Sequence, residues 1–183
     1  MTKKLKVALL CGGPSLERGI SLNSARSVCD HLHSDTVEVI PVYFDHKKKA
    51  YRISRAQLYS NTPSDFDFKL AQSARPLGQT ALTKFLKSVD LAFPVMHGPF
   101  GEDGEIQRRL KKTGRPFIGS PEAACKRAFD KYSANEFIAK QGFYTLPSMV
   151  LKAHLSGHKK KIENFFKEHK IKRAVVKPAT TSP

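Results

Sequence analysis

A chain of 183 residues with 40% hydrophobic content is long enough to bury a core, as one large domain or two small ones. No apolar run approaches the roughly 18 residues of a membrane-spanning helix, and the apolar run near the N-terminus is too short for a signal peptide. The three cysteines are widely spaced and form no CxxC pair, which argues against a disulfide framework or a zinc site and favours the cytoplasm.

The charge is strongly basic, because 32 lysine and arginine residues against 16 aspartate and glutamate residues give a net charge of +16. Such an excess is typical of proteins that bind nucleic acid. The lysines, however, gather in short runs such as 47–49 and 159–161, without interleaved aromatic residues or a recognisable nucleic-acid motif. We therefore favour solvated basic faces that attract anionic ligands such as nucleotides, and we expect no nucleic-acid partner.

The N-terminal part of the chain has the pattern of strand, glycine loop, helix and strand. An apolar run at 6–10 predicts the first strand, and two glycines follow it directly. Ser21 is the expected N-cap of a helix over 21–33, and the β-branched run 37–44 predicts the second strand. This order predicts an α/β fold with a doubly wound, mainly parallel sheet.

The stretch 90–120 predicts a second unit of strand, turn, helix and strand. The apolar run 91–96 reads as a buried strand, and His97 and Gly98 lie where that run ends. A glycine-rich acidic turn, a helical segment and a further strand at 116–119 follow. Ligands of open α/β sheets collect beyond the carboxyl ends of the strands, so we expect His97 at a ligand-binding edge.

The segments on either side of this unit are less regular. Residues 45–87 are polar and contain two prolines, and we interpret them as an insertion or an elaborated crossover with a weak helix at 80–87. Apolar spacing predicts one helix over 122–141 and a basic helix over 156–169. Two further strands are expected at 144–151 and 174–178.

Five polar residues have two interpretations each. Glu17 precedes the first helix, where a glutamate commonly favours the helix dipole, but at this sheet edge it can also bind an ammonium group. His97 is either a hydrogen-bonded histidine at a strand end or a neighbour of a ligand, and Asp103 either caps a helix or shapes a pocket. Lys131, taken by itself, is typical of a surface lysine. Lys177 lies beside a proline in a predicted strand, and this position indicates a strand edge that faces a cleft.

Five motifs follow one another in an order that is similar to a known family. They are GGPSLERGISLNSA at 12–25, FPVMHGPFGEDGEIQ at 93–107, PFIGS at 116–120, FDK at 129–131 and VVKPA at 175–179. Together they closely resemble D-alanine–D-alanine ligases of the ATP-grasp superfamily, across nearly the whole chain except 45–87. The resemblance implies a substrate-binding, pre-ATP-grasp domain over 1–121, followed by the start of an α+β ATP-grasp nucleotide-binding domain over 122–183.

The resemblance also implies a chemistry for the first domain. Enzymes of this family join two D-alanines for peptidoglycan: ATP phosphorylates the carboxylate of the first D-alanine, and the amine of the second attacks the acyl phosphate. By motif match, Glu17 would hold the ammonium group of the first D-alanine, and His97 would lie beside the substrate as a second catalytic residue. Ser21 and Gly98 would help to form the same pocket.

The resemblance assigns Lys131 and Lys177 to the nucleotide, because the family uses two lysines to neutralise ATP phosphates. Two departures stand beside this match. Gly19 replaces a second acidic residue that the family usually has after the glutamate, and residues 179–183 do not form the usual Gly-Ser-Ser phosphate loop. The Mg²⁺ carboxylates and the second-substrate site of the family have no counterpart, so we expect no metal ligands in this chain.

The resemblance therefore implies the N-terminal part of a ligase, which we expect to need a complementing C-terminal chain for turnover. A homodimer is a further expectation that comes from the family. The alternative is a non-catalytic remnant or binding module whose basic surface binds an anionic partner.

Overall fold

A computed structural model describes residues 3–152 and 154–179, which form two compact units. The first unit ends at Lys126 and the second begins at Arg127. Among the described residues, none of the helices is long and apolar enough to cross a membrane.

The first unit is built on a four-stranded sheet in the order β3-β2-β1-β4. The strands are β1 (Leu5–Gly12), β2 (Val37–Phe44), β3 (Ala50–Arg52) and β4 (Leu91–Pro94). Strand β1 pairs in parallel with both β2 and β4, and only β3 is antiparallel, which confirms the mainly parallel sheet. The expected strand at 116–119 is reduced to one parallel bridge, between Phe117 and Ala92.

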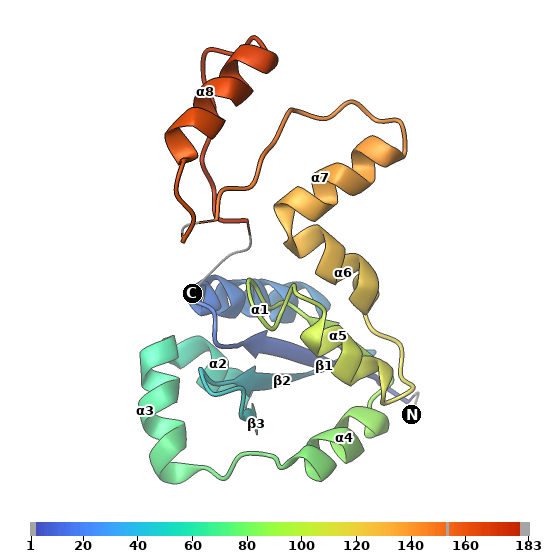
Figure 1. Cartoon of the computed structure of the whole chain (residues 1–183). Coiled ribbons are helices and arrows are strands. Elements are labelled where there is room, and N and C mark those ends of the chain that lie inside the picture. The colour runs from blue at the N-terminus through green and yellow to red at the C-terminus, as the bar shows by residue number, and fades with distance from the viewer. Residues whose placement is uncertain (1–2, 153, 180–183) are drawn as a thin grey trace. The chain divides into compact units, whose positions relative to one another are not determined.

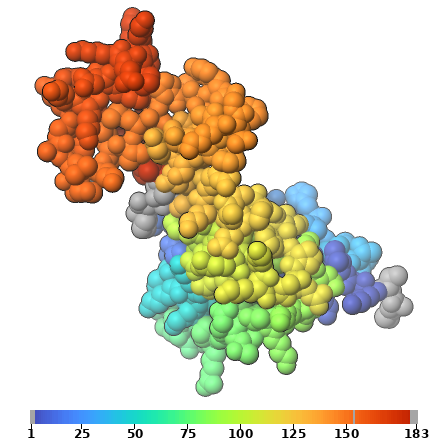
Figure 2. Space-filling view, turned by 45° about the vertical axis from the view of Figure 1, so that its right-hand side comes forward, coloured from blue at the N-terminus to red at the C-terminus, as the bar shows by residue number. Residues whose placement is uncertain are grey.

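Helices cover both faces of this sheet, as a doubly wound fold requires (Figure 1). One face packs against α1 (Arg18–Leu32), α2 (Arg55–Ser60) and α3 (Pro63–Ser73), and the other against α4 (Gln79–Ser88) and α5 (Glu105–Lys111). Successive strand residues face opposite layers: Leu9 and Tyr43 lie on the α1 side, whereas Leu10 and Phe44 lie on the α4 side. Figure 2 shows the green to yellow part of the chain, which includes α4 and α5, as one continuous surface.

The segment 45–87 is far more ordered than its polar composition indicates. It contains β3, α2, α3 and α4, so the helix expected at 80–87 is confirmed as α4, whereas β3, α2 and α3 were not predicted. Capping boxes begin two of these helices, with Ser54 at the start of α2 and Thr62 at the start of α3. Leu58 and Phe66 are buried against the sheet. The segment is a folded crossover from β2 to β4.

Helix α1 begins at Arg18, and the prediction that Ser21 is its N-cap is wrong. Glu17 occupies the cap position, although its side chain makes no capping hydrogen bond. The Arg18 N–H already donates to the Ser15 carbonyl oxygen at 3.2 Å, so the chain turns before Ser21 is reached. The Ser21 hydroxyl is thereby left for contacts with other elements.

The single helix expected over 122–141 is two helices, α6 (Glu122–Phe129) and α7 (Lys131–Lys140). Asp130 interrupts them with an extended backbone and caps α7, because its carboxylate accepts a hydrogen bond from the Ser133 N–H at 2.6 Å. The second unit also contains α8 (His158–Glu168), which confirms the expected basic helix within two residues of its predicted bounds.

The strands predicted at 144–151 and 174–178 are not formed in the described part of the second unit. Val175 and Val176 are 80% and 91% exposed, so the apolar run that includes Lys177 has no sheet to pack on there. A strand exists only where a neighbour completes its hydrogen-bond ladder. The apolar pattern predicts which residues suit a strand, but the described residues supply no such neighbour.

Candidate functional site

Two loops meet at the carboxyl edge of the sheet because β1 and β4 are parallel neighbours. The loop after β1 carries Glu17, and the loop after β4 carries His97 and Gly98. A Cβ atom added to Gly98 would clash with Ser15 Oγ and would lie 3.4 Å from Glu17 Oε2, and the φ angle of Gly98 is +70°. The fold therefore brings Glu17 and Gly98 together, and only glycine permits this close approach.

Ser21 joins these two loops from inside α1. Its side chain is fully buried, and its hydroxyl accepts a hydrogen bond from the Gly12 N–H at 2.9 Å. The same hydroxyl donates to the Val95 carbonyl oxygen at 2.7 Å. The structure thus gives Ser21 a bridging role, while a direct contact with substrate stays a prediction.

His97 is half-buried and faces α1, where its Nε2 atom lies 3.3 Å from Ser24 Oγ. Sequence reasoning did not single out Ser24. The available signal was its position three residues after Ser21, because residues at that spacing share one face of a helix. Ser24 is therefore the side chain that holds the imidazole against α1.

The acidic turn after His97 is held by its own carboxylates. Glu102 Oε2 accepts a hydrogen bond from the Gly98 N–H at 2.6 Å. The two oxygens of Asp103 accept from the N–H groups of Phe100 and Glu105, each at 2.9 Å. Gly104 is the N-cap residue of α5, without a side-chain cap, so Asp103 lies one position before the cap and binds the first N–H of the helix.

The charges around Glu17 leave its carboxylate available to a cation. Glu17 is exposed, and the neighbouring Arg18 points to Asp67, with Arg18 Nη1 at 2.9 Å from Asp67 Oδ2. Within the described part of the chain, Glu17 itself takes part in no ion pair. An ammonium group at this edge would meet an uncompensated carboxylate.

Lys131 and Lys177 both belong to the second unit, and both side chains are exposed. Lys131 begins α7, and its backbone N–H donates to the carbonyl oxygen of Ala179 at 3.0 Å. The segment that carries Lys177 therefore returns to the first turn of α7. Two exposed ammonium groups in one unit suit the phosphates of a nucleotide.

The described residues contain no preformed cluster of metal ligands. Over 3–152 and 154–179, no group of three or more histidine, cysteine, aspartate or glutamate side chains lies close enough to hold one. Mg²⁺ prefers oxygen ligands in octahedral geometry, which this part of the chain does not assemble.

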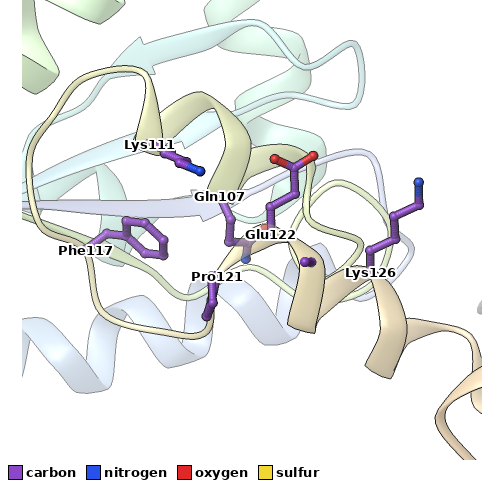
Figure 3. A pocket seen from close by; sticks show the side chains of 7 residues that line it. Gln107, Lys111, Phe117, Pro121, Glu122 and Lys126 are labelled. Carbon is purple, nitrogen blue, oxygen red and sulfur yellow. The ribbon is translucent and has the colours of Figure 1, made fainter. Parts of the chain in front are cut away.

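A cavity of about 340 Å³ lies on the first unit, away from the predicted residues (Figure 3). Gln107 Nε2, on its wall, donates to the Gly101 carbonyl oxygen at 2.7 Å and so supports the acidic turn. None of Glu17, Ser21 and His97 lines this cavity. Its lining residues are Gln107, Lys111, Phe117, Pro121, Glu122, Ala123 and Lys126.

Comparison with known sequences gives a consistent picture. The family profile described as "D-ala D-ala ligase N-terminus" matches residues 6–120. A D-alanine–D-alanine ligase from Chlorobium phaeovibrioides is 29% identical over 161 residues, with 82% of this chain and 45% of the relative covered. One from Limosilactobacillus reuteri is 31% identical over 156 residues, with 82% of this chain and 41% of the relative covered. The chain thus spans less than half the length of these curated relatives.

Solved structures share the fold. The D-alanine–D-alanine ligase from Coxiella burnetii has a TM-score of 0.76 at 23% identity, over 90% of this chain and 50% of that chain. The enzyme from Bacillus anthracis complexed with ATP has a TM-score of 0.62 at 18% identity, over 87% of this chain and 44% of that chain. The profile match over most of the first unit, together with these relatives, shows that the chain belongs to the D-alanine–D-alanine ligase family and corresponds to its N-terminal part.

Proposed function

We propose that the chain supplies the first-substrate half of a D-alanine–D-alanine ligase, which forms D-alanyl-D-alanine with ATP for peptidoglycan and cell-wall synthesis. The observation that carries this proposal is the approach of the Glu17 carboxylate to Gly98 at the carboxyl edge of β1 and β4. Because this chain contains that edge of the sheet, it contains the part of the fold that we propose binds the first substrate.

Each residue of this edge has a distinct task in the proposal. Glu17 binds the ammonium group of the first D-alanine, because an exposed carboxylate and an ammonium form a charge-assisted hydrogen bond. His97, which contacts Ser24, lies beside the substrate, and Gly98 allows a close approach to Ser15 and Glu17 that any larger residue would prevent. Ser21 holds both loops at this spacing, whether or not it also touches the substrate.

Lys131 and Lys177 are the proposed nucleotide residues. ATP, when bound, supplies the phosphoryl group that activates the carboxylate of the first D-alanine. The two exposed ammonium groups then neutralise phosphate charge, which is the main requirement of phosphoryl transfer. The Mg²⁺ ligands are proposed to lie in a C-terminal part, since the described residues assemble no suitable carboxylate group.

Turnover is proposed to require that C-terminal part, because the chain spans only 41–45% of the relatives compared above. The complementing part is the proposed protein partner, and a homodimer stays a family-based proposal. A cytoplasmic location is also proposed, supported by the free thiols of Cys11, Cys29 and Cys125, which suit a reducing compartment.

Nuclear magnetic resonance of the 183-residue chain tests the substrate site directly. D-alanine should shift the amide signals of residues 15–18 and 97–98, with an affinity on the order of millimolar for half of a site. Glu17→Gln should abolish these shifts, because it removes the charge and keeps the size. Glu136→Gln, on the other unit, serves as the matched control, and L-alanine tests the stereochemistry. Equal shifts in the wild type and Glu17→Gln would contradict the proposal.

Complementation tests the activity. The chain is mixed with the C-terminal half of the Limosilactobacillus reuteri relative, and D-alanine-dependent phosphate release from ATP is measured. Release is expected with both parts and not with either alone. If the chain alone released phosphate, the proposed need for a C-terminal part would be wrong. If it instead bound nucleic acid with a steep salt dependence and ignored D-alanine, the alternative of a basic binding module would replace the ligase.

A further inference from the structure

Two ion pairs connect the crossover segment 45–87 to the two loops of the candidate site. Asp67 of α3 reaches Arg18, the residue after Glu17, at 2.9 Å. Lys48, in the turn between β2 and β3, reaches Glu105 at 2.6 Å, at the end of the turn that follows His97. Each pair joins the crossover to a different loop.

The Asp67–Arg18 pair is partly shielded from water, because the two side chains are only 20% and 23% exposed. It lies outside hydrogen-bond geometry, so the attraction is one of charge. His46 Nδ1 lies 3.4 Å from the same oxygen of Asp67. The buried Tyr43 hydroxyl is close enough that burial first, and the Asp67 charge second, raise the pKa of that phenol.

The Asp67–Arg18 pair affects the position of Glu17 through the backbone. Arg18 is the first residue of α1 and Glu17 is its N-cap, so a fixed Arg18 side chain limits the directions that the preceding residue can take. Asp67 also keeps the Arg18 guanidinium away from the Glu17 carboxylate, which would otherwise have a competing cation next to it. The crossover thus governs both the position and the availability of the carboxylate.

The Lys48–Glu105 pair acts on the other loop. Glu105 also binds Arg109 at 2.7 Å, and the cations of Lys48 and Arg109 lie 5.3 and 4.9 Å from the centre of the Phe100 ring. Phe100 is fully buried and has a φ angle of +75°, a conformation that costs a residue with a side chain. The two cations and Glu105 surround this strained residue, two positions after Gly98.

We propose that Asp67 and Lys48 are positioning residues of the substrate site, Asp67 through Arg18 for Glu17, and Lys48 through Glu105 for the turn after His97. The proposal deepens the proposed function and rests on it for the identity of D-alanine. The crossover, whose composition indicates an insertion, is then the element that sets the distance between the two loops.

The first measurement is the affinity of the chain for D-alanine, which is determined from the shifts of the amide signals during a titration. Asp67→Asn and Lys48→Gln should each weaken binding by about tenfold, the effect of losing one partly shielded charge interaction. Lys48→Arg keeps the charge and should retain the affinity. Lys47→Gln and Asp35→Asn remove charges that make no ion pair in the described part of the chain, and they should change nothing. Equal affinity in all five variants would overturn the proposal.

The second measurement needs no substrate. Hydrogen exchange should become faster at the amides of Glu17, Arg18 and Ser21 in Asp67→Asn, and at Gly98, Phe100 and Glu102 in Lys48→Gln. Each variant should leave the other loop unchanged, whereas general destabilisation would speed exchange at both loops. Exchange at wild-type rates in both variants, or faster at both loops in either, would overturn the proposal.

The two measurements separate the two proposals. If the wild type fails to bind D-alanine, the proposed function is wrong, and the exchange rates alone decide whether the crossover positions the loops. If the wild type binds D-alanine through Glu17 but the variants bind equally well, the ligase proposal stands and the positioning role is wrong.

Discussion

The Ser21 hydroxyl of α1 donates to the Val95 carbonyl oxygen at 2.7 Å while it accepts from the Gly12 N–H at 2.9 Å. One buried side chain thereby joins the ends of β1 and β4, the two strands whose loops carry Glu17 and His97. This side-chain bridge adds to the backbone pairing of β1 with β4, in which the Val95 N–H donates to the Leu10 carbonyl oxygen at 2.9 Å.

Ser21→Ala should destabilise the first unit by about 1–3 kcal/mol, because it leaves a buried carbonyl and a buried N–H without their partner. Urea unfolding followed by circular dichroism measures the change. Ser27→Ala is the matched control on the exposed face of the same helix and should stay within about 0.5 kcal/mol of the wild type. Equal unfolding midpoints for both variants would show that the bridge carries no stability.

Ser24→Ala should affect ligand binding more than stability. The hydroxyl lies 3.3 Å from His97 Nε2, and its loss frees the ring to rotate away from α1. We expect D-alanine binding to weaken by roughly threefold to tenfold, the value of one neutral hydrogen bond. The histidine ring signals of the chain should also move in the absence of ligand. Unchanged ring signals would mean that Ser24 does not orient His97.

Gly12→Ala should be much more destabilising than Gly114→Ala, although both glycines have a left-handed backbone, with φ angles of +84° and +70°. A methyl group at position 114 meets no atom within 4 Å, so only the backbone cost of about 1 kcal/mol applies. At position 12 the methyl group would clash with the Phe44 carbonyl oxygen and would lie 2.5 Å from the Tyr43 ring.

We therefore expect a loss of about 3 kcal/mol or more for Gly12→Ala, measured by thermal or urea unfolding. Failure of the Gly12→Ala variant to fold would also agree with this expectation. Losses of similar size in the two variants would contradict the close packing of β1 against β2 at its carboxyl end.

Helix α7 should lose helical content in acid. Hydrogen bonds from the backbone and side chain of Ser133 hold the pKa of Asp130 below its ordinary value. A carboxyl group whose pKa is lowered by folding stabilises the helix above its unfolded pKa, and this contribution is lost as the pH falls through the folded pKa. Signals of residues 131–140 followed between pH 7 and pH 2 measure the effect. Asp130→Ala should show the weakened helix already at pH 7, and an identical profile in both chains would contradict the capping role.

The Asp130 cap is a local motif, but the sequence analysis missed it and predicted one helix over 122–141. Runs of apolar and β-branched residues indicated β1, β2 and β4, and the glycine-rich turn with His97 indicated the position of the site. The capping boxes of α2 and α3 were equally local and were available as signals in the sequence. The two loops were expected to meet because parallel neighbouring strands end at one edge.

What the sequence by itself determined is therefore the set of residues that suit each strand, helix and turn, since these preferences depend on neighbours along the chain. Only the tertiary structure decided that Ser21 joins the ends of β1 and β4, that the apolar run at 174–178 has no neighbouring strand in the described chain, and that Ser24 and Asp67 reach the site. The physical reason is that these outcomes depend on contacts between residues far apart in sequence: Ser21 with Val95, Ser24 with His97, and Arg18 with Asp67. Contacts of this kind, between residues that are distant in sequence, produce no periodic pattern in the amino-acid sequence.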